Sequence, residues 1–351
     1  MFEDLLRSWD GEEAVVRYDA PTGAWMFVGV HSTVLGPSCG GTRMKTYAEP
    51  AAGLRDVLRL SSAMTSKMAM ASIPLGGGKA VLAVPQIPGG RARRELLLRY
   101  GDLVGSLHGT YVTACDMNTA PPDMDVIAER TPHVFGRTRG NGGSGTSAPN
   151  TAVGLFHGLR AAVAHAFGSG DLSGRTVAVQ GVGAVGGPLS RMLAEAGARL
   201  TLADIDDVRA KELADELDAE TVPADAILRT ECDVLAPCAT GGALNQETIP
   251  TLRCRVIAGA ANNQLGEPGD AELLRERKIL YAPDYVVNAG GVIHLVGFEM
   301  LGEDHDRVNE RLRAIGDTLG EVFRLAETGG ISTGAAADAL VEQRLAAGRS
   351  T

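Results

Sequence analysis

The stretch Arg175-Thr176-Val177-Ala178-Val179-Gln180-Gly181-Val182-Gly183-Ala184-Val185-Gly186-Gly187 runs from an apolar strand pattern directly into glycines spaced G-x-G-x-x-G. A helical pattern of apolar residues follows, and a second apolar strand, residues 199–203, ends in Asp204. Strand, glycines, helix, strand and an acidic residue about 20 positions on make up the full dinucleotide-binding pattern. The second half of the chain is therefore predicted to be a parallel α/β sheet that binds a dinucleotide.

Each element of this pattern has a distinct expected role. Gly181 makes the tight turn, Gly183 admits the pyrophosphate to the helix N-terminus, and Gly186 lets helix and strand pack closely. Asp204 is expected to accept hydrogen bonds from the adenosine ribose hydroxyls. The same carboxylate would repel a 2′-phosphate, which favours NAD over NADP.

Three further apolar runs, residues 234–237, 256–260 and 279–282, fit additional parallel strands, each followed by small or amide residues. Because the carboxyl ends of parallel strands lie at one edge of a sheet, Asn262 and Asn288 are expected near the nicotinamide half of the cofactor. A neutral amide can bind a carboxamide or a carboxylate without adding net charge. Local turn bonding by these asparagines is the alternative.

Upstream, Thr65 to Lys79 brings two lysines, a proline and three successive glycines together. Apolar residues before it recur at helical spacing, from Leu54 to Met68, and Lys67 shares their face. Pro74 ends the helix, the glycines are expected to form a loop close to a bound molecule, and Lys79 opens a strand. Two neighbouring ammonium groups repel each other, which favours one lysine as a base. Two unrelated surface lysines remain the alternative.

The remaining N-terminal elements are predicted to be strands at 14–18 and 25–30, a glycine-rich bend at 35–44, a helix at 91–107 and a strand at 111–115. Asp116 stands at the end of that last strand, where open α/β sheets place chemistry. Asp116 could instead cap the next helix. Asp123 is better placed as that cap, which leaves Asp116 available.

Glycine, serine and arginine dominate residues 136–150, which reads as a flexible connection between domains. The expected division is a catalytic, substrate-binding and oligomerisation domain at 1–148 and a Rossmann NAD-binding domain at 149–331. The last helix, 332–351, is expected to pack back on the first domain.

Composition limits the classes of partner. The net charge is −10 without long basic runs, which argues against nucleic acid or an anionic membrane as a partner. No apolar run approaches the ~20 residues of a membrane span. The acidic N-terminus argues against a signal peptide, and five scattered cysteines suit a reducing cytoplasm. The histidines and cysteines show no metal-ligand spacing, so no metal is expected.

Together these motifs resemble the glutamate/leucine/phenylalanine/valine dehydrogenase family over nearly the whole chain. The resemblance implies two α/β domains separated by a cleft, and reversible NAD-dependent oxidative deamination of an L-amino acid to its 2-oxo acid and ammonia by a homo-oligomer. The matching segments are 36–37, 40–43, 64–67, 74–79, 116–119, 181–187, 258–263, 281–284 and 288–291.

The resemblance also implies roles for individual residues. Lys67 would pair with the substrate α-carboxylate, Lys79 would activate the water that attacks the iminium, and Asp116 would relay protons to the substrate nitrogen. Further substrate contacts would come from Gly40, Gly41, Met64, Ala114, Asn262, Asn288, Val292 and Leu295. Besides the glycines and Asp204, cofactor contacts would come from Ala184, Val185, Ala239, Thr240, Ala260 and Asn262.

Substrate choice follows in part from the same comparison. Glutamate-specific relatives carry a lysine just before the Gly-Gly pair, where this chain has Cys39, so glutamate is disfavoured. The run 292–297 looks most like phenylalanine dehydrogenases of the actinobacterial type, which favours phenylalanine. Leucine or valine remains an alternative, because one methylene changes discrimination by only ~1–3 kcal/mol. A sensor or assembly subunit that binds NAD without catalysis is the alternative from another class.

Overall fold

The computed structural model describes residues 2–349, and these fall into two compact units. Within the described residues, unit 1 comprises residues 2–146, 295–302 and 343–349, and unit 2 comprises residues 147–294 and 303–342. Met1, at the acidic N-terminus, and the last two positions of the C-terminal helix expected at 332–351 lie outside the described residues. Among the described residues, no helix combines the length and apolarity needed to cross a bilayer.

Unit 1 is built on a five-stranded mixed sheet with the order β1-β2-β4-β3-β5. Strands β1, β2 and β4 pair antiparallel, whereas β4, β3 and β5 pair parallel. The strands are β1 Glu13–Asp19, β2 Ala24–Ser32, β3 Ser38–Lys45, β4 Gly76–Ala83 and β5 Tyr111–Cys115, and the helices are α1 Phe2–Ser8, α2 Pro50–Met70, α3 Gly90–Gly105 and α4 Pro121–Ala128.

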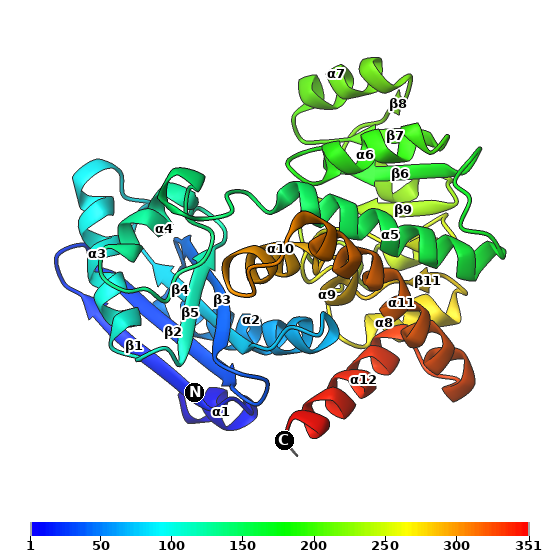
Figure 1. Ribbon diagram of the computed structural model, residues 1–351. Helices are drawn as coiled ribbons and strands as arrows, with labels where there is room; N and C mark the ends of the chain where they lie inside the picture. The colour runs from blue at the N-terminus through cyan, green and yellow to red at the C-terminus, as the bar shows by residue number, and fades with distance from the viewer. Residues whose placement is uncertain (1, 350–351) are drawn as a thin grey trace. The chain divides into compact units, whose positions relative to one another are not determined.

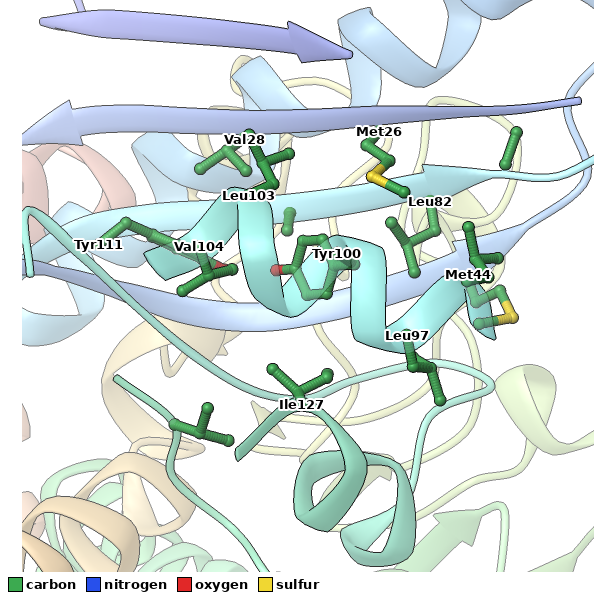
Figure 2. Close-up of a cluster of buried hydrophobic side chains, with 14 of the residues drawn as sticks. Met26, Val28, Met44, Leu82, Leu97, Tyr100, Leu103, Val104, Tyr111 and Ile127 are labelled. Atoms are coloured by element: carbon green, nitrogen blue, oxygen red, sulfur yellow. The ribbon is translucent and has the colours of Figure 1, made fainter. Parts of the chain in front are cut away.

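Alternation along the strands of unit 1 produces two apolar layers, one on each face of the sheet. On one face, Val28 and Leu82 pack with Tyr100 and Leu103 of α3 and Ile127 of α4 (Figure 2). On the other face, Phe27 and Val81 pack with apolar residues of α2, including Leu54, Val57 and Leu58. Lys79 and Val81 are two residues apart on β4, so Lys79 belongs to the face that α2 covers.

Unit 2 contains a six-stranded sheet with the order β11-β10-β9-β6-β7-β8, and every pairing in it is parallel. This confirms the predicted parallel α/β half. The strands are β6 Thr176–Gln180, β7 Arg199–Ala203, β8 Glu220–Thr221, β9 Val234–Pro237, β10 Val256–Ile257 and β11 Leu280–Tyr281 (Figure 1).

Helices from two parts of the chain accompany this sheet. α5 Ala148–Phe167 packs against α11 His305–Gly329, with Gly158 close to Leu319 and Ile315. The remaining helices are α6 Gly186–Glu195, α7 Asp207–Leu217, α8 Asp270–Glu276, α9 Asp284–Val287, α10 Gly290–Glu299 and α12 Thr333–Gly348. Helices α10 and α12 each contribute residues to both units.

Two glycine-rich segments differ from their predicted conformation. Residues 76–78, expected in a loop against a bound molecule, begin strand β4, and residues 38–44, expected in a bend, lie in strand β3. The reason is close packing inside the protein. A Cβ on Gly77 would lie 2.0 Å from Thr65 Oγ1, and a Cβ on Gly40 would lie 1.7 Å from the Gly78 carbonyl oxygen. The absence of a side chain at each glycine therefore lets a neighbouring segment of the protein approach the backbone. Glycine by itself weakens a strand, and this close packing offsets that effect.

The glycine-rich segment after α4 makes more contacts than its composition indicates. Glu299 accepts hydrogen bonds from the Gly136 and Ser144 amides at 2.9 and 2.8 Å. Asp125 accepts bonds from the Thr138 amide and hydroxyl. All these residues belong to unit 1, so carboxylates from two helices fix the segment that was expected to be a flexible linker.

Candidate active site

Lys79 and Asp116 form an ion pair on the face of the unit 1 sheet that α2 covers. Lys79 stands in β4 opposite Gly29 of β2 and is 6% exposed. Asp116 follows β5 directly, and its Oδ1 lies 3.0 Å from Lys79 Nζ. The structure therefore brings together the two residues that the sequence predicted as catalytic, although they are far apart in the chain.

A second cation holds the other oxygen of Asp116. Arg43 of β3 donates from Nε to Asp116 Oδ2 at 2.9 Å, and the Asp116 amide donates to Thr119 Oγ1. Burial raises the pKa of Asp116, but Lys79 and Arg43 outweigh it and hold that pKa well below its usual range. Asp116 is consequently an anion with both oxygens engaged. The cap of α4 comes from Asp123, whose carboxylate accepts a bond from the Ala120 amide, as predicted.

Gly40 and Gly41 of β3 leave room for this pair. A Cβ on Gly41 would lie 2.3 Å from the Cys115 carbonyl oxygen and 2.9 Å from Asp116 Cβ. A side chain at Gly41 would therefore displace the end of β5 and the carboxylate that follows it. Both glycines are therefore sites where another backbone segment of unit 1 approaches closely.

Lys67 lies in the last turn of α2, whose buried face matches the predicted apolar spacing. Lys67 and Met64 are both half-buried. Thr65, between them, is buried and packs against Gly77 of β4, just before Lys79. Lys67 therefore lies at the end of α2 that contacts the glycine-rich start of β4.

The apolar residues expected around a substrate side chain are distributed over both units. Ala114 is buried on β5, and Leu295 packs near Gly136 and belongs to unit 1. Val292 is half-buried and belongs to unit 2. Cys39 is buried on β3, where burial raises the pKa of its thiol to about 12 despite nearby Lys79. Its side chain is therefore neutral near pH 7.

The glycine fingerprint of unit 2 has the geometry that a dinucleotide turn needs. Gly181 follows β6 with φ +88°, a conformation that favours glycine. A Cβ on Gly186 would lie 1.9 Å from the Gly181 carbonyl oxygen, whereas a Cβ on Gly183 would meet nothing within 4 Å. Gly186 thus permits the packing of α6 on the strand, and Gly183 leaves open space where a pyrophosphate can approach. Ala184 is exposed and Val185 is half-buried beside them.

Asp204 follows β7 and holds the fingerprint turn together. Its Oδ2 accepts a bond from the Val182 amide at 2.8 Å, and its Oδ1 accepts one from the Asp206 amide at 3.0 Å. Arg209 Nη1 lies 3.7 Å from Oδ1. A carboxylate has about four acceptor positions, so these contacts leave capacity for ribose hydroxyls.

The loops beyond β9 and β10 carry the other predicted cofactor contacts. Ala239, Thr240 and Asn262 are exposed, and Ala260 is half-buried. Asn288 is buried and donates from Nδ2 to the Ala260 carbonyl oxygen and to Asn262 Oδ1, which brings the two predicted amides together. Asn288 follows the short helix α9, not a strand as expected.

These residues fit a nicotinamide dinucleotide. Among the described residues, no hydrogen-bond partner lies within reach of the buried Asn288 Oδ1, which leaves an acceptor for a carboxamide N–H. The open space at Gly183 and the turn at Gly181 suit a pyrophosphate. Across the described part of the chain, no group of three or more His, Cys, Asp or Glu side chains could hold a metal ion.

Sequence reasoning assigned no role to Arg43, Asp56 or Tyr47, which the structure connects to Asp116. Arg43 Nη1 donates to Asp56 Oδ2 at 3.0 Å, and the Tyr47 hydroxyl donates to the same oxygen at 2.6 Å. Arg43 lay within the quoted Gly-Gly-Thr-Arg run, which was the available signal. Its partner Asp116 lies 73 positions away, and residue spacing does not predict a contact over that distance.

Comparison with known proteins agrees with this architecture. Residues 22–133 match the model of the Glu/Leu/Phe/Val dehydrogenase dimerisation domain, and residues 200–347 match the glutamate/leucine/phenylalanine/valine dehydrogenase model. A leucine dehydrogenase of Thermoactinomyces intermedius is 42% identical over 99% of this chain and 94% of its own length. A valine dehydrogenase of Streptomyces albus is 45% identical over 96% of this chain and 93% of its own length.

A solved structure of a related protein has the same fold. The L-tryptophan dehydrogenase from Nostoc punctiforme superposes with a TM-score of 0.85 at 38% identity, over the whole of both chains. Fold and site thus define an NAD(P)-dependent oxidoreductase that acts on amino acids. The chain belongs to the glutamate/leucine/phenylalanine/valine dehydrogenase family.

Proposed function

We propose that this protein catalyses the reversible, NAD-dependent oxidative deamination of a hydrophobic L-amino acid, with a branched aliphatic side chain preferred. The products are the 2-oxo acid and ammonia. The observation that carries this proposal is the ion pair between buried Lys79 and half-buried Asp116 in a chain that also has a complete dinucleotide fingerprint. Such a pair suits proton transfer at a carbon–nitrogen centre, and the fingerprint suits the cofactor.

In the proposed reaction, Lys67 pairs as an ammonium with the substrate α-carboxylate, and Asp116 accepts a hydrogen bond from the substrate nitrogen. Bound NAD supplies the hydride acceptor. Lys79 takes a proton from the water that attacks the iminium carbon, and Asp116 relays a proton to the departing nitrogen. The strong preference of Asp116 for its anionic form means that it holds a proton only transiently.

The names of the relatives support a hydrophobic substrate. Proteins 42–45% identical to this chain are called leucine and valine dehydrogenase, and the superposed structure is a tryptophan dehydrogenase. They support branched-chain substrates better than phenylalanine, which the sequence favoured through residues 292–297. Phenylalanine therefore remains a prediction, now second to leucine and valine. The buried, neutral Cys39 supports the exclusion of glutamate.

Other parts of the proposal concern the cofactor and the assembly. The position of the Asp204 carboxylate beside the fingerprint turn supports NAD over NADP, because a 2′-phosphate would meet a negative charge. The description of the N-terminal family model as a dimerisation domain supports a homo-oligomer. Light scattering of the purified protein would measure the number of subunits.

The test is a kcat/KM profile at alkaline pH, followed by NADH absorbance, across leucine, valine, phenylalanine, tryptophan, tyrosine and glutamate. Leucine or valine should give the highest kcat/KM, glutamate should give no signal, and NADP should replace NAD poorly. A highest value for phenylalanine would reinstate the sequence-based preference. Turnover of glutamate alone would contradict the Cys39 argument, and no turnover with any amino acid would contradict the proposed function.

A further inference from the structure

A line of alternating charges continues from the catalytic pair to helix α2. Lys79 contacts Asp116 at 3.0 Å, Asp116 contacts Arg43 at 2.9 Å, and Arg43 contacts Asp56 at 3.0 Å. Tyr47 donates to Asp56, and Arg59 contacts the second Asp56 oxygen at 2.9 Å. The line thus runs from β4 through β5 and β3 to the helix that carries Lys67.

The inner members of this line are largely withdrawn from water. The Arg43 and Asp56 side chains are 14% and 13% exposed, whereas Arg59 at the outer end is 52% exposed. Withdrawing charges from water is costly unless partners satisfy them, so this half-buried Arg–Asp pair is weak evidence of a purely stabilising role. Arg43 divides its guanidinium between two carboxylates, Nε to Asp116 and Nη1 to Asp56, which fixes the plane of the group.

We propose that Arg43, anchored by Asp56, is a positioning residue that holds the Asp116 carboxylate and shares its negative charge with Lys79. This sharing limits how strongly Asp116 holds the Lys79 ammonium. The inference rests on the proposed function, in which Lys79 is the base and Asp116 the proton relay.

The groups around Asp116 determine in which direction the loss of Arg43 shifts the pH dependence of activity. Lys79 faces it from β4 and Arg43 from β3. Burial keeps the Cys115 thiol neutral by raising its pKa to about 12, and burial with the bond to Asp56 raises the pKa of Tyr47. Without Arg43, the undivided carboxylate would hold the Lys79 ammonium more strongly and would itself accept a proton more readily. Both changes move the acid limb of activity to higher pH.

The kinetic test compares Arg43→Met with the wild-type protein over pH 6–11. We expect kcat to fall roughly tenfold near pH 8 with little change in KM, because Lys67 still binds the substrate carboxylate. The acid limb of kcat/KM should move up by about half a pH unit or more. Arg43→Lys should recover part of the rate. Arg99→Met, which removes another arginine–aspartate pair of unit 1, should leave the profile unchanged.

A second measurement does not need activity. The chain has five lysines, so lysine labelled with ¹³C at Cε gives few signals, and Lys79→Met assigns the relevant one. In Arg43→Met the titration midpoint of the Lys79 signal should rise, while that of Lys211 should stay fixed. Asp56→Asn removes one of the two carboxylates that Arg43 contacts and should move the Lys79 midpoint the opposite way. This variant also keeps the test possible if Arg43→Met fails to fold.

The possible outcomes distinguish the role of Arg43 from the proposed activity of the protein. A folded Arg43→Met protein with an unchanged Lys79 midpoint and an unchanged acid limb would overturn the inference. A wild-type protein without amino-acid turnover would contradict the proposed function, while the lysine titration would still report on the charge line.

Discussion

At the residue scale, Asp116 is the side chain on which most of the site depends. It follows β5, contacts Lys79 and Arg43 with its two oxygens, and has a pKa held well below its usual range by those cations against the effect of burial. A depressed pKa means that the carboxylate contributes stability that is fully present above its unfolded pKa of about 3.9. That contribution is lost as the pH falls below this value.

Replacement Asp116→Asn should therefore destabilise the protein most near neutral pH. The variant leaves buried Lys79 and half-buried Arg43 without the carboxylate that they share, so the free energy of unfolding at pH 7 should fall by about 3 kcal/mol or more. Urea unfolding at pH 7 and at pH 3 measures the effect, and the difference from the wild-type protein should narrow at the lower pH, which lies below the unfolded pKa of the carboxyl.

Asp102→Asn is the matched control for this experiment. Asp102 pairs with Arg130 in the same unit, but both side chains are half-exposed and 3.7 Å apart. The change in its unfolding free energy should stay within about 1 kcal/mol. Equal stability of the Asp116→Asn and wild-type proteins at pH 7 would refute the electrostatic account of this residue.

The predicted residues differ in how directly sequence could reveal them. Asp116 and Lys79 stood at recognisable positions, a strand end and a glycine-flanked strand start. The partners Arg43, Asp56 and Tyr47 form a network only because β3 and α2 meet in three dimensions. No local spacing encodes such a contact, so sequence reasoning missed it.

At the element scale, the glycines of the fingerprint divide into packing and binding roles. Gly186→Ala would place a methyl group 1.9 Å from the Gly181 carbonyl oxygen and should lower the thermal midpoint by several degrees. Gly183→Ala would meet open space and should keep the wild-type midpoint. Because that space is where a pyrophosphate approaches, Gly183→Ala should instead weaken NAD binding roughly tenfold.

Differential scanning fluorimetry and titration calorimetry with NAD measure both quantities on the same samples. The two variants act as controls for each other, because each carries a single added methyl group. Similar losses of stability in both, or unchanged NAD affinity in Gly183→Ala, would contradict this division of roles.

Sequence predicted the helices and strands with a regular pattern of apolar residues well, but it predicted the glycine-rich strands wrongly. The pattern found β5, the β6–α6–β7 unit and the apolar face of α2, because alternation and helical spacing are local properties. Residues 38–44 were predicted as part of a bend and residues 76–78 as a loop, yet both segments lie in strands. Glycine ordinarily disfavours strands, and here the close approach of Thr65, Gly78 and Cys115 overrides that preference.

At the scale of the whole molecule, the two units carry separate halves of the proposed chemistry. Unit 1 holds Lys67, Lys79 and Asp116, and unit 2 holds the fingerprint, Asp204, Asn262 and Asn288. Sequence placed the boundary at residue 148, and contacts place it at 146, with helices α10 and α12 divided between the units. The return of the chain from one unit to the other depends on long-range packing, which sequence spacing does not encode.

This separation makes Lys79→Ala the most direct test of the central claim. The account predicts that the variant binds NAD with wild-type affinity by calorimetry, because the fingerprint belongs to the other unit. Its turnover of leucine or valine should fall by about three orders of magnitude or more, since the base for the attacking water is lost. Turnover close to that of the wild-type protein, with NAD binding intact, would contradict the account.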